Sequence, residues 1–337
     1  MTSNLSNGTS RCITIAIAGE PNVGKSTIVN LISGKDVSIA TNKPQTTRFN
    51  VKGIYSQGEH QIIFVDTPGV FKFKGRSGLE KYIISNAWTG IRSSDKIMLV
   101  VDPKKKLSDG FKYLQSEIER SGEQAILVIN KIDITKPEEL EEFEASIPNK
   151  HLFDKIFRLS AKADLGVVPL IEYLKDISPV APWAFKDGEV TDLDIEETLS
   201  EITRKHIFLN FKQEIPYSSR VETISISQPY QQIIKTKTTH LKQPNRVEDL
   251  LNDDYDEDQG NENESGEVVL KTIDVIQNVI VDKDNHKKIV IGAKGVMLTK
   301  LLKDASADMQ EFLADGTRVK LRLVVKVKPN WREKINY

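Results

Sequence analysis

The segment Gly19–Thr27 contains the residue types of a phosphate-binding loop. Gly19 and Gly24 let the backbone curve around a phosphate chain, so that successive amide N–H groups can point at its oxygens. Lys25 can meet the β- and γ-phosphates as a point charge, and the hydroxyl of Ser26 can coordinate Mg²⁺. We therefore predict that the following residues bind a nucleoside triphosphate: Gly19, Glu20, Pro21, Asn22, Val23, Gly24, Lys25, Ser26 and Thr27.

A second motif, Asp66 to Gly69, follows an apolar run and suits the same ligand. Its aspartate can hold Mg²⁺ through a water molecule, and the amide of Gly69 can contact a γ-phosphate. Such a short motif alone is usually a turn or a helix cap. Its position at a strand end, after a phosphate-binding loop, favours ligand binding. The predicted contacts are Asp66, Thr67, Pro68, Gly69 and Val70.

Two later motifs indicate that the base is guanine. The carboxylate of Asp133 can accept two hydrogen bonds from N–H groups on the Watson–Crick edge of guanine, and adenine lacks this pair of donors. ATP would leave a buried charge unpaired, so we expect selection of GTP. A backbone N–H in the segment Ser160–Lys162 can meet the guanine oxygen. The predicted guanine contacts are Asn130, Lys131, Ile132, Asp133, Ser160, Ala161 and Lys162.

In this order, each at the end of a strand, the four motifs resemble those of the translation-factor-related GTPases. Pro44-Gln45-Thr46-Thr47-Arg48 is similar to the effector segment of one branch, the Era family. The resemblance implies that Thr47 is the Mg²⁺ ligand that senses the γ-phosphate, with Thr46 as the alternative. The metal set is then Ser26, Thr47 and Asp66, and the catalytic set is Lys25, Thr47 and Gly69.

Val70 departs from the pattern of Ras-like enzymes, which place a glutamine after the second motif to orient the attacking water. Valine can neither donate nor accept a hydrogen bond, so we predict slow intrinsic hydrolysis. The rate would come from positioning and charge stabilisation. Asn22 resembles an asparagine that holds K⁺ in related enzymes, where K⁺ acts in place of an arginine finger. Whether this chain uses K⁺ stays open.

Residues 11–178 alternate between strand-sized apolar runs and helical patterns. This alternation predicts an α/β domain with a mostly parallel sheet and helices on both faces, here a P-loop GTPase domain. The predicted strands are Ile13–Ala18, Val51–Tyr55, Gln61–Val65, Lys96–Val101, Gln124–Ile129 and Lys155–Leu159. The predicted helices are Lys25–Ser33, Gly78–Arg92, Ser108–Ser121, Glu138–Ser146 and Val168–Asp176. A proline-containing stretch then begins a predicted linker, residues 179–197.

Residues 198–334 predict a second, α+β domain around a Gly-x-x-Gly loop, Gly292–Gly295. Two glycines let the backbone approach a nucleic-acid strand while a basic residue between them meets phosphate. The order helix, strand, strand, helix, helix, strand is that of a type II KH domain. The clearest elements are Thr198–Lys212, Val221–Ile226, Val268–Val281, Gly295–Leu313 and a last strand, Arg318–Lys328. The predicted RNA contacts are Lys287, Lys288, Gly292, Ala293, Lys294 and Gly295.

Charge is divided unevenly in this second half. Residues 249–267 contain nine acidic side chains and no basic one, whereas residues 318–334 contain seven basic side chains and one acidic. The basic run predicts a polyanion-binding end. The acidic run lies in a predicted disordered insertion, at about residues 229–266. We expect it to shield the basic surface, so that deleting residues 252–266 tightens RNA binding at low salt.

The resemblance to the Era family covers almost the whole chain, including Glu201–Lys205, Glu214–Ser218 and Val325–Arg332. It implies a GTPase that binds the 3′ end of 16S ribosomal RNA, assists assembly of the small (30S) ribosomal subunit and contacts the inner membrane peripherally. The expected partners are GTP, GDP, this RNA and the 30S precursor, and the expected cofactor is Mg²⁺.

Composition is that of an ordinary soluble protein: 337 residues, 39% hydrophobic, with a net charge of −1. The single cysteine, Cys12, excludes a disulfide framework and a multi-cysteine metal site. The longest apolar runs fall short of the roughly 20 residues that a membrane span needs. We expect a cytoplasmic monomer. The competing hypothesis is a GTP-regulated membrane- or protein-binding switch that contacts no RNA.

Overall fold

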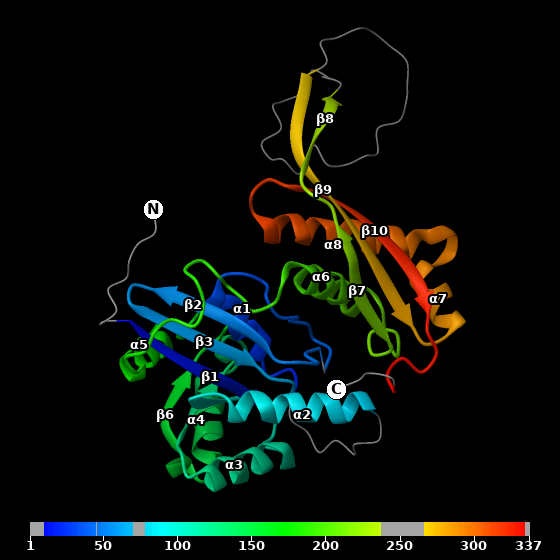
Figure 1. Ribbon diagram of the computed structural model, residues 1–337. Helices are drawn as coiled ribbons and strands as arrows, with labels where there is room; N and C mark the ends of the chain where they lie inside the picture. Colours follow the sequence, from blue (N-terminus) through cyan, green and yellow to red (C-terminus); the bar gives the residue numbers. More distant parts are fainter. Residues whose placement is uncertain (1–9, 45, 70–77, 237–265, 334–337) are drawn as a thin grey trace.

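The computed structural model describes residues 10–44, 46–69, 78–236 and 266–333, which form two α/β units (Figure 1). The N-terminal unit has a six-stranded sheet in the order β2-β3-β1-β4-β5-β6. Only β2 runs antiparallel to its neighbour, so the predicted mostly parallel sheet is confirmed. The strands are β1 (Arg11–Gly19), β2 (Val51–Gln57), β3 (His60–Asp66), β4 (Lys96–Val101), β5 (Ala125–Ile129) and β6 (Phe153–Arg158).

Helices cover both faces of this sheet, because alternate strand residues are apolar on each side. Helices α1 (Lys25–Ser33) and α5 (Val167–Ile177) pack on one face, against Ile15, Phe64 and Met98 among others. The other face packs against α2 (Gly78–Arg92), α3 (Asp109–Ser121) and α4 (Pro137–Ser146). Among the helices of the described residues, none has both the length and the apolar character that crossing a bilayer requires.

The predicted linker lies against the N-terminal unit instead of spanning open space. The amide of Cys12 donates to the carbonyl of Pro179 at 3.2 Å, and the amide of Ile54 donates to the carbonyl of Val190 at 2.9 Å. The side chain of Gln61 bonds to the backbone of residues 184 and 185. The segment therefore runs along the sheet, in contact with β1, β2 and β3, before the second unit begins.

The C-terminal unit is a mixed sheet covered on one face by helices. Its order is β10-β9-β7, with β10 parallel and β7 antiparallel to β9, and β8 also pairs with β9. Buried Ile207, Val290 and Leu301 bring the three helices onto the strands. The elements are α6 (Ile195–Asn210), β7 (Ser219–Ile226), β8 (Tyr230–Thr236), β9 (Gly266–Val281), α7 (Asp284–Ile291), α8 (Val296–Leu313) and β10 (Arg318–Val327).

Two boundaries of this unit differ from the sequence prediction. Helix α6 begins at Ile195, inside the predicted linker, because Asp194 and Glu197 form a capping box that starts the helix earlier. The predicted insertion at about 229–266 begins and ends in ordered strands: Tyr230–Thr236 pairs with Gly266–Thr272 as a ribbon (Figure 1). The acidic residues at 249–264 lie outside the described residues.

Candidate functional site

The predicted phosphate-binding loop joins β1 to α1 and is tightly built. Gly24 has φ 102°, and a Cβ placed there would lie 2.2 Å from the side-chain nitrogen of Asn130. Asn22 also takes a positive φ, 60°, and its side-chain amide donates to the carbonyl of Asn42 at 2.8 Å. This conformation at the N-terminus of α1 suits a row of backbone N–H groups that bind an anion.

Lys25 lies inside this loop and is buried. Its ammonium donates to the carbonyls of Gly19 at 3.1 Å and Glu20 at 3.0 Å. Burial lowers the pKa of Lys25 to about 8, although the nearby Asp66 opposes the shift. A phosphate beside this ammonium would favour its charged form.

The three predicted magnesium ligands lie together at one corner. Oδ2 of Asp66 accepts hydrogen bonds from Ser26 Oγ at 2.6 Å and from Thr47 Oγ1 at 3.2 Å. The two hydroxyls are 3.3 Å apart. Asp66 is fully buried and its Oδ1 has no hydrogen-bond partner among the described residues. Burial raises the pKa of Asp66, although Lys25 opposes the shift. A carboxylate and two hydroxyls form an oxygen donor set that fits Mg²⁺.

The rest of the second motif is fixed against the first. The hydroxyl of Thr67 donates to the carbonyl of Ile17 at 2.7 Å, and a Cβ on Gly69 would lie 3.0 Å from Pro21. Thr46 and Thr47 both line the cavity over the phosphate-binding loop, which measures about 50 Å³. Of these two threonines, Thr47 is the one that bonds to Asp66. Val70, the predicted departure from Ras-like enzymes, lies outside the described residues.

The predicted guanine residues meet at the ends of β5 and β6. The side-chain nitrogen of Asn130 donates to the carbonyl of Val23 at 2.8 Å, and its side-chain oxygen accepts a hydrogen bond from the backbone amide of Ala161 at 3.0 Å. Asp133 is held by Ser160 Oγ at 2.6 Å and is exposed, not buried as the sequence argument assumed. Rejection of ATP would therefore depend on the base covering this carboxylate when it binds.

One buried residue of this corner was missed by the sequence analysis. Asp102 follows β4, and its Oδ2 lies 2.8 Å from the ammonium of Lys131, which also donates to the carbonyl of Asn22 at 2.5 Å. Asp102 thus fixes Lys131 against the phosphate-binding loop. Its position at the end of a parallel strand is the signal that could have identified it.

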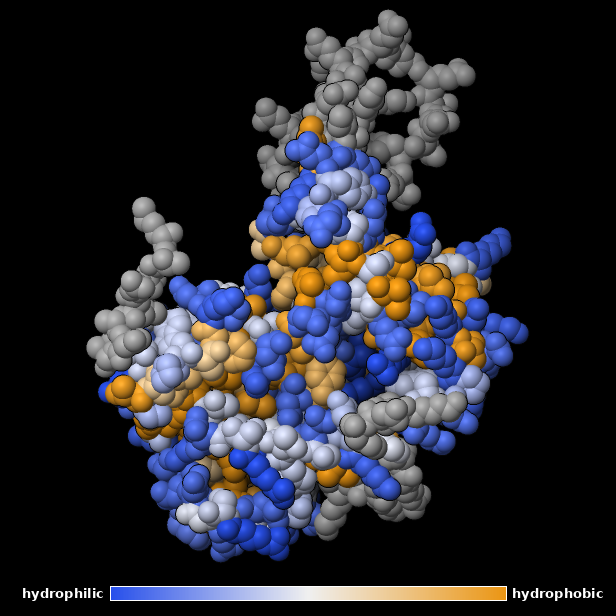
Figure 2. Space-filling view, in the orientation of Figure 1, coloured by the Kyte–Doolittle hydropathy of each residue, from blue (hydrophilic) through white to orange (hydrophobic). Residues whose placement is uncertain are grey.

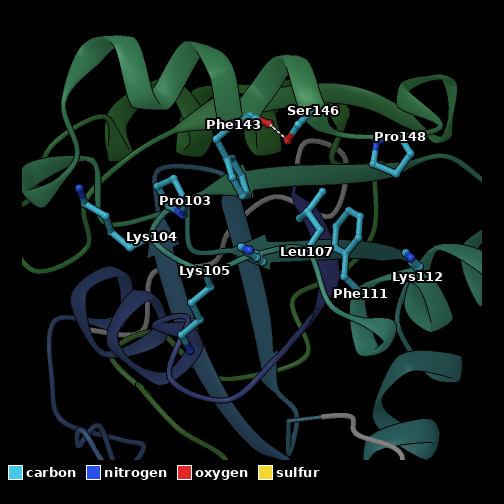
Figure 3. Close-up of a pocket in the computed structure, with 10 residues that line it drawn as sticks. Pro103, Lys104, Lys105, Leu107, Phe111, Lys112, Phe143, Ser146 and Pro148 are labelled. Carbon is cyan, nitrogen blue, oxygen red and sulfur yellow. Dashed lines mark hydrogen bonds between the residues drawn. The ribbon is translucent and has the colours of Figure 1, made fainter.

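A groove of about 480 Å³ lies between the segment that follows β4, the start of α3 and the end of α4 (Figure 3). Leu107, Phe111 and Phe143 line it together with a run of lysines. Lys105 of this run donates to the carbonyl of Pro21 at 2.8 Å, and burial lowers the pKa of Lys105. Lys105 therefore links this wall of the groove to the phosphate-binding loop.

The segment between α1 and β2, residues 34–48 without Gln45, ends in the effector segment and joins the two units. The guanidinium of Arg48 is buried and donates to the carbonyls of Ser219 at 2.9 Å, Pro216 at 2.9 Å and Tyr217 at 3.3 Å. Burial, with Arg204 nearby, lowers the pKa of Arg48 to about 9, so the group stays charged at neutral pH. The residue beside Thr47 is thus bound to the C-terminal unit.

Three further residues between α1 and β2 reach the C-terminal unit. Lys43 donates to the carbonyls of Phe208 and Phe211 at the end of α6. Lys35 donates to the carbonyl of Phe312 at 2.9 Å, and Asp36 forms an ion pair with Lys205 at 2.6 Å. The segment that carries the predicted γ-phosphate sensor therefore contacts both α6 and α8.

The Gly-x-x-Gly loop joins α7 to α8. Gly292 has φ 74°, and a Cβ there would lie 2.7 Å from Cγ of Met297, whereas Gly295, with φ 81°, faces open space. Ala293 and Lys294 are exposed. Lys288 and Lys294 are exposed and Lys287 is partly exposed, and within the described residues their ammonium groups have no hydrogen bond or ion pair. The loop and its lysines are therefore free to meet a ligand.

The last strand, β10, has the predicted alternation. Val319, Leu323 and Val325 are buried, while Lys320, Arg322, Lys326 and Lys328 are exposed. Figure 2 shows hydrophilic and apolar side chains side by side over this unit. A basic surface therefore exists on the same unit as the glycine loop, although Lys334 lies outside the described residues.

Comparisons with known proteins match both units. Residues 14–131 match a family model of a 50S ribosome-binding GTPase, and residues 260–332 match a KH domain model. The chain is similar to the GTPase Era of Ehrlichia canis, 31% identical over 97% of this chain and 96% of that protein. It is 32% identical to the GTPase Era of Mesorhizobium japonicum, over 94% of this chain and 88% of the relative.

Two solved structures resemble the whole chain. One is a crystal structure of Era in complex with MgGDPNP and nucleotides 1506–1542 of 16S ribosomal RNA, with a TM-score of 0.79 and 28% identity over 97% of this chain and 96% of that one. The other is a variant of Aquifex aeolicus Era bound to GDP·AlF4⁻, with a TM-score of 0.78 and 27% identity over 96% of each chain. The arrangement of a GTPase domain followed by a KH domain is confirmed.

Proposed function

Because this chain belongs to the Era family of GTPases, we propose that it is a slow GTP-hydrolysing switch whose KH domain binds the 3′ end of 16S ribosomal RNA. In this role it would assist assembly of the small ribosomal subunit. Two adjacent residues carry the switch proposal. Thr47 bonds to Asp66 in the nucleotide site, and Arg48 bonds to three carbonyls of the KH domain.

Each part of the nucleotide would meet a separate group of residues. Asp133 would accept the N–H groups of guanine, and the ammonium of Lys25 would lie against the β- and γ-phosphates. Ser26, Thr47 and Asp66 would hold Mg²⁺, which when bound neutralises charge on the phosphates. The amide of Gly69 would contact the γ-phosphate. Hydrolysis of GTP to GDP and phosphate would then rest on positioning and charge, since Val70 cannot orient the water.

The use of K⁺ is an additional proposal that depends on Asn22. Its backbone carbonyl accepts a hydrogen bond from Lys131, and its side-chain amide donates to the carbonyl of Asn42, close in sequence to the effector segment. A cation bound there would add positive charge beside the phosphates. GTP turnover measured in K⁺ and in Na⁺ buffer tests this, and equal rates would remove K⁺ from the mechanism.

RNA binding is proposed from the free lysines and the exposed glycine loop, together with the RNA-bound relative. The loop residues 292–295 would approach the RNA backbone, while Lys287, Lys288 and Lys294 meet phosphates. Filter binding of a 16S 3′ fragment across a salt series tests the proposal, because phosphate contacts give a steep salt slope. An absence of binding at low salt would instead favour a switch that acts on a protein or a membrane.

The link between the domains is tested by GTP turnover with and without the RNA fragment. We expect the RNA to change turnover, and we expect Gly292→Asp to abolish that change while leaving basal turnover intact. We also propose a monomer that lies in the cytoplasm, contacts the 30S precursor and touches the inner membrane peripherally. Co-sedimentation with 30S precursors and with membrane vesicles tests these last contacts separately.

A further inference from the structure

Asp66 receives a third hydroxyl that belongs to no predicted motif. Ser38 Oγ donates to Oδ2 of Asp66 at 2.5 Å, and Ser38 is 6% exposed. The other two hydroxyls on this oxygen are those of Ser26 and Thr47. Three short side chains from three different parts of the sequence therefore converge on one buried carboxylate oxygen.

Ser38 is itself held firmly by α1. The amide of Ser38 donates to Oδ1 of Asn30 at 2.9 Å, and the side-chain nitrogen of Asn30 donates back to the carbonyl of Ser38 at 2.8 Å. Because α1 begins at Lys25, within the phosphate-binding motif, this clamp fixes Ser38 relative to that motif. A hydroxyl positioned in this way can orient the group that it contacts.

We propose that Ser38 is a positioning residue for the divalent cation, and that its hydroxyl holds the Asp66 carboxylate in the orientation that binds Mg²⁺. Ser26 and Thr47 are expected to turn oxygen lone pairs toward the metal. Ser38 is outside that ligand set, so its hydroxyl can stay on Asp66 whether or not a metal is bound. This inference rests on the proposed function, since it assumes that the chain binds a nucleotide with Mg²⁺.

The test is the release of a fluorescent GDP analogue from the full chain as Mg²⁺ is titrated. Magnesium should slow release from the wild type. For Ser38→Ala we expect the Mg²⁺ concentration at half effect to rise about tenfold, because the charged carboxylate of Asp66 loses a hydrogen bond that it accepts. Release in excess EDTA should match the wild type, since the hydroxyl acts through the metal. Ser38→Thr keeps a hydroxyl and should restore most of the affinity.

Ser33→Ala is the matched control. Ser33, the last residue of α1, is also buried, but its hydroxyl donates to the carbonyl of Val29 at 2.7 Å and makes no hydrogen bond with Asp66. Its half-effect concentration should equal that of the wild type. Asn30→Ala, which removes the clamp and leaves the hydroxyl in place, should shift the titration in the same direction as Ser38→Ala.

Three results would overturn the inference. The Mg²⁺ concentration at half effect could be unchanged in Ser38→Ala, or it could be lower than in the wild type. Nucleotide release from Ser38→Ala could also be faster than from the wild type by the same factor in EDTA as in Mg²⁺. If Ser38→Ala does not fold, Asn30→Ala decides by the same criteria. A wild-type chain whose release does not respond to Mg²⁺ would instead contradict the proposed metal site. The two failures are therefore distinguishable.

Discussion

The nucleotide site and the glycine loop of the KH domain differ in where their polar groups point. In the nucleotide site, Asn130, Lys131 and Asp66 are each bonded to groups of the protein. In the glycine loop, Lys294 is exposed, and the part that the structure fixes is the backbone conformation of Gly292, with its positive φ. This difference suggests that the first site selects its ligand by side chains fixed in advance, and the second by access to a backbone.

The first prediction tests side-chain selection in its strongest form. Asp133→Asn should lower the affinity for GTP roughly a thousandfold, because an amide cannot accept both N–H groups of guanine and turns its own N–H group toward them. Affinity for xanthosine triphosphate should rise, since xanthine carries a carbonyl where guanine carries an amino group. Calorimetry with both nucleotides measures the two effects.

The control for this change is Asp164→Asn. Asp164 is an exposed aspartate in the neighbouring loop with φ 51°, a conformation that asparagine also tolerates. It should bind GTP like the wild type. A variant at Asp133 that keeps its GTP affinity would show that the guanine is selected elsewhere.

The second prediction tests backbone access. Gly292→Asp should weaken binding of the 16S 3′ fragment about a hundredfold, because it places a side chain against Met297 and a negative charge at the RNA backbone. GTP affinity should stay within about twofold. Gly316→Asp is the control, since Gly316 also has a positive φ but lies past the opposite end of α8 in open space. Equal losses in the two variants would mean that charge alone decides RNA affinity.

The nucleotide site was predictable from sequence because its residues directly follow apolar strands. Parallel strands bring their carboxyl ends to one edge, so Asp66, Asn130 and Ser160 were expected together, and the structure places them so. Helices α1 and α2 begin and end where periodicity predicts. Their apolar stripes and the buried strands reinforce one another at each level.

Other features depend on contacts that leave no sequence signal. Arg48 is buried against backbone carbonyls, and any residue can supply a carbonyl. Strand β8 was missed because its glutamines and lysine adjoin a polar run and its pairing depends on β9. Ser38 reaches Asp66 across 28 residues, and nothing local distinguishes it from a loop serine.

The third prediction concerns the contact between the two domains that Arg48 makes. Arg48→Lys should keep basal GTP turnover within about twofold, but should make the effect of RNA on turnover about fivefold smaller, a coupling loss of roughly 1 kcal/mol. A lysine cannot reproduce the planar fork that reaches three carbonyls. Turnover with and without the RNA fragment measures the coupling.

Arg120→Lys is the control for this contact, because Arg120 is exposed on α3 and, among the described residues, forms its ion pair with Glu117 of the same helix. It should keep the full RNA effect. If Arg48→Lys also keeps that effect, the two regions communicate without the effector segment, or the docking of Arg48 is only structural.

The fourth and smallest effect should come from the acidic run that lies in the sequence between β8 and β9. Residues 252–264 contain seven acidic side chains and no basic one, and the ribbon β8–β9 joins them to the sheet that carries the basic face of β10. Deleting them, with Gly266 kept because it begins β9, should tighten RNA binding about threefold at low salt. The gain should vanish at high salt, where charges beyond a few ångströms are screened.

Replacing the same seven residues with asparagine and glutamine keeps the length and should give the same gain. A gain from deletion alone would mean that bulk, not charge, keeps RNA away from the glycine loop. If neither variant gains RNA affinity, the acidic run does not limit RNA binding at the glycine loop.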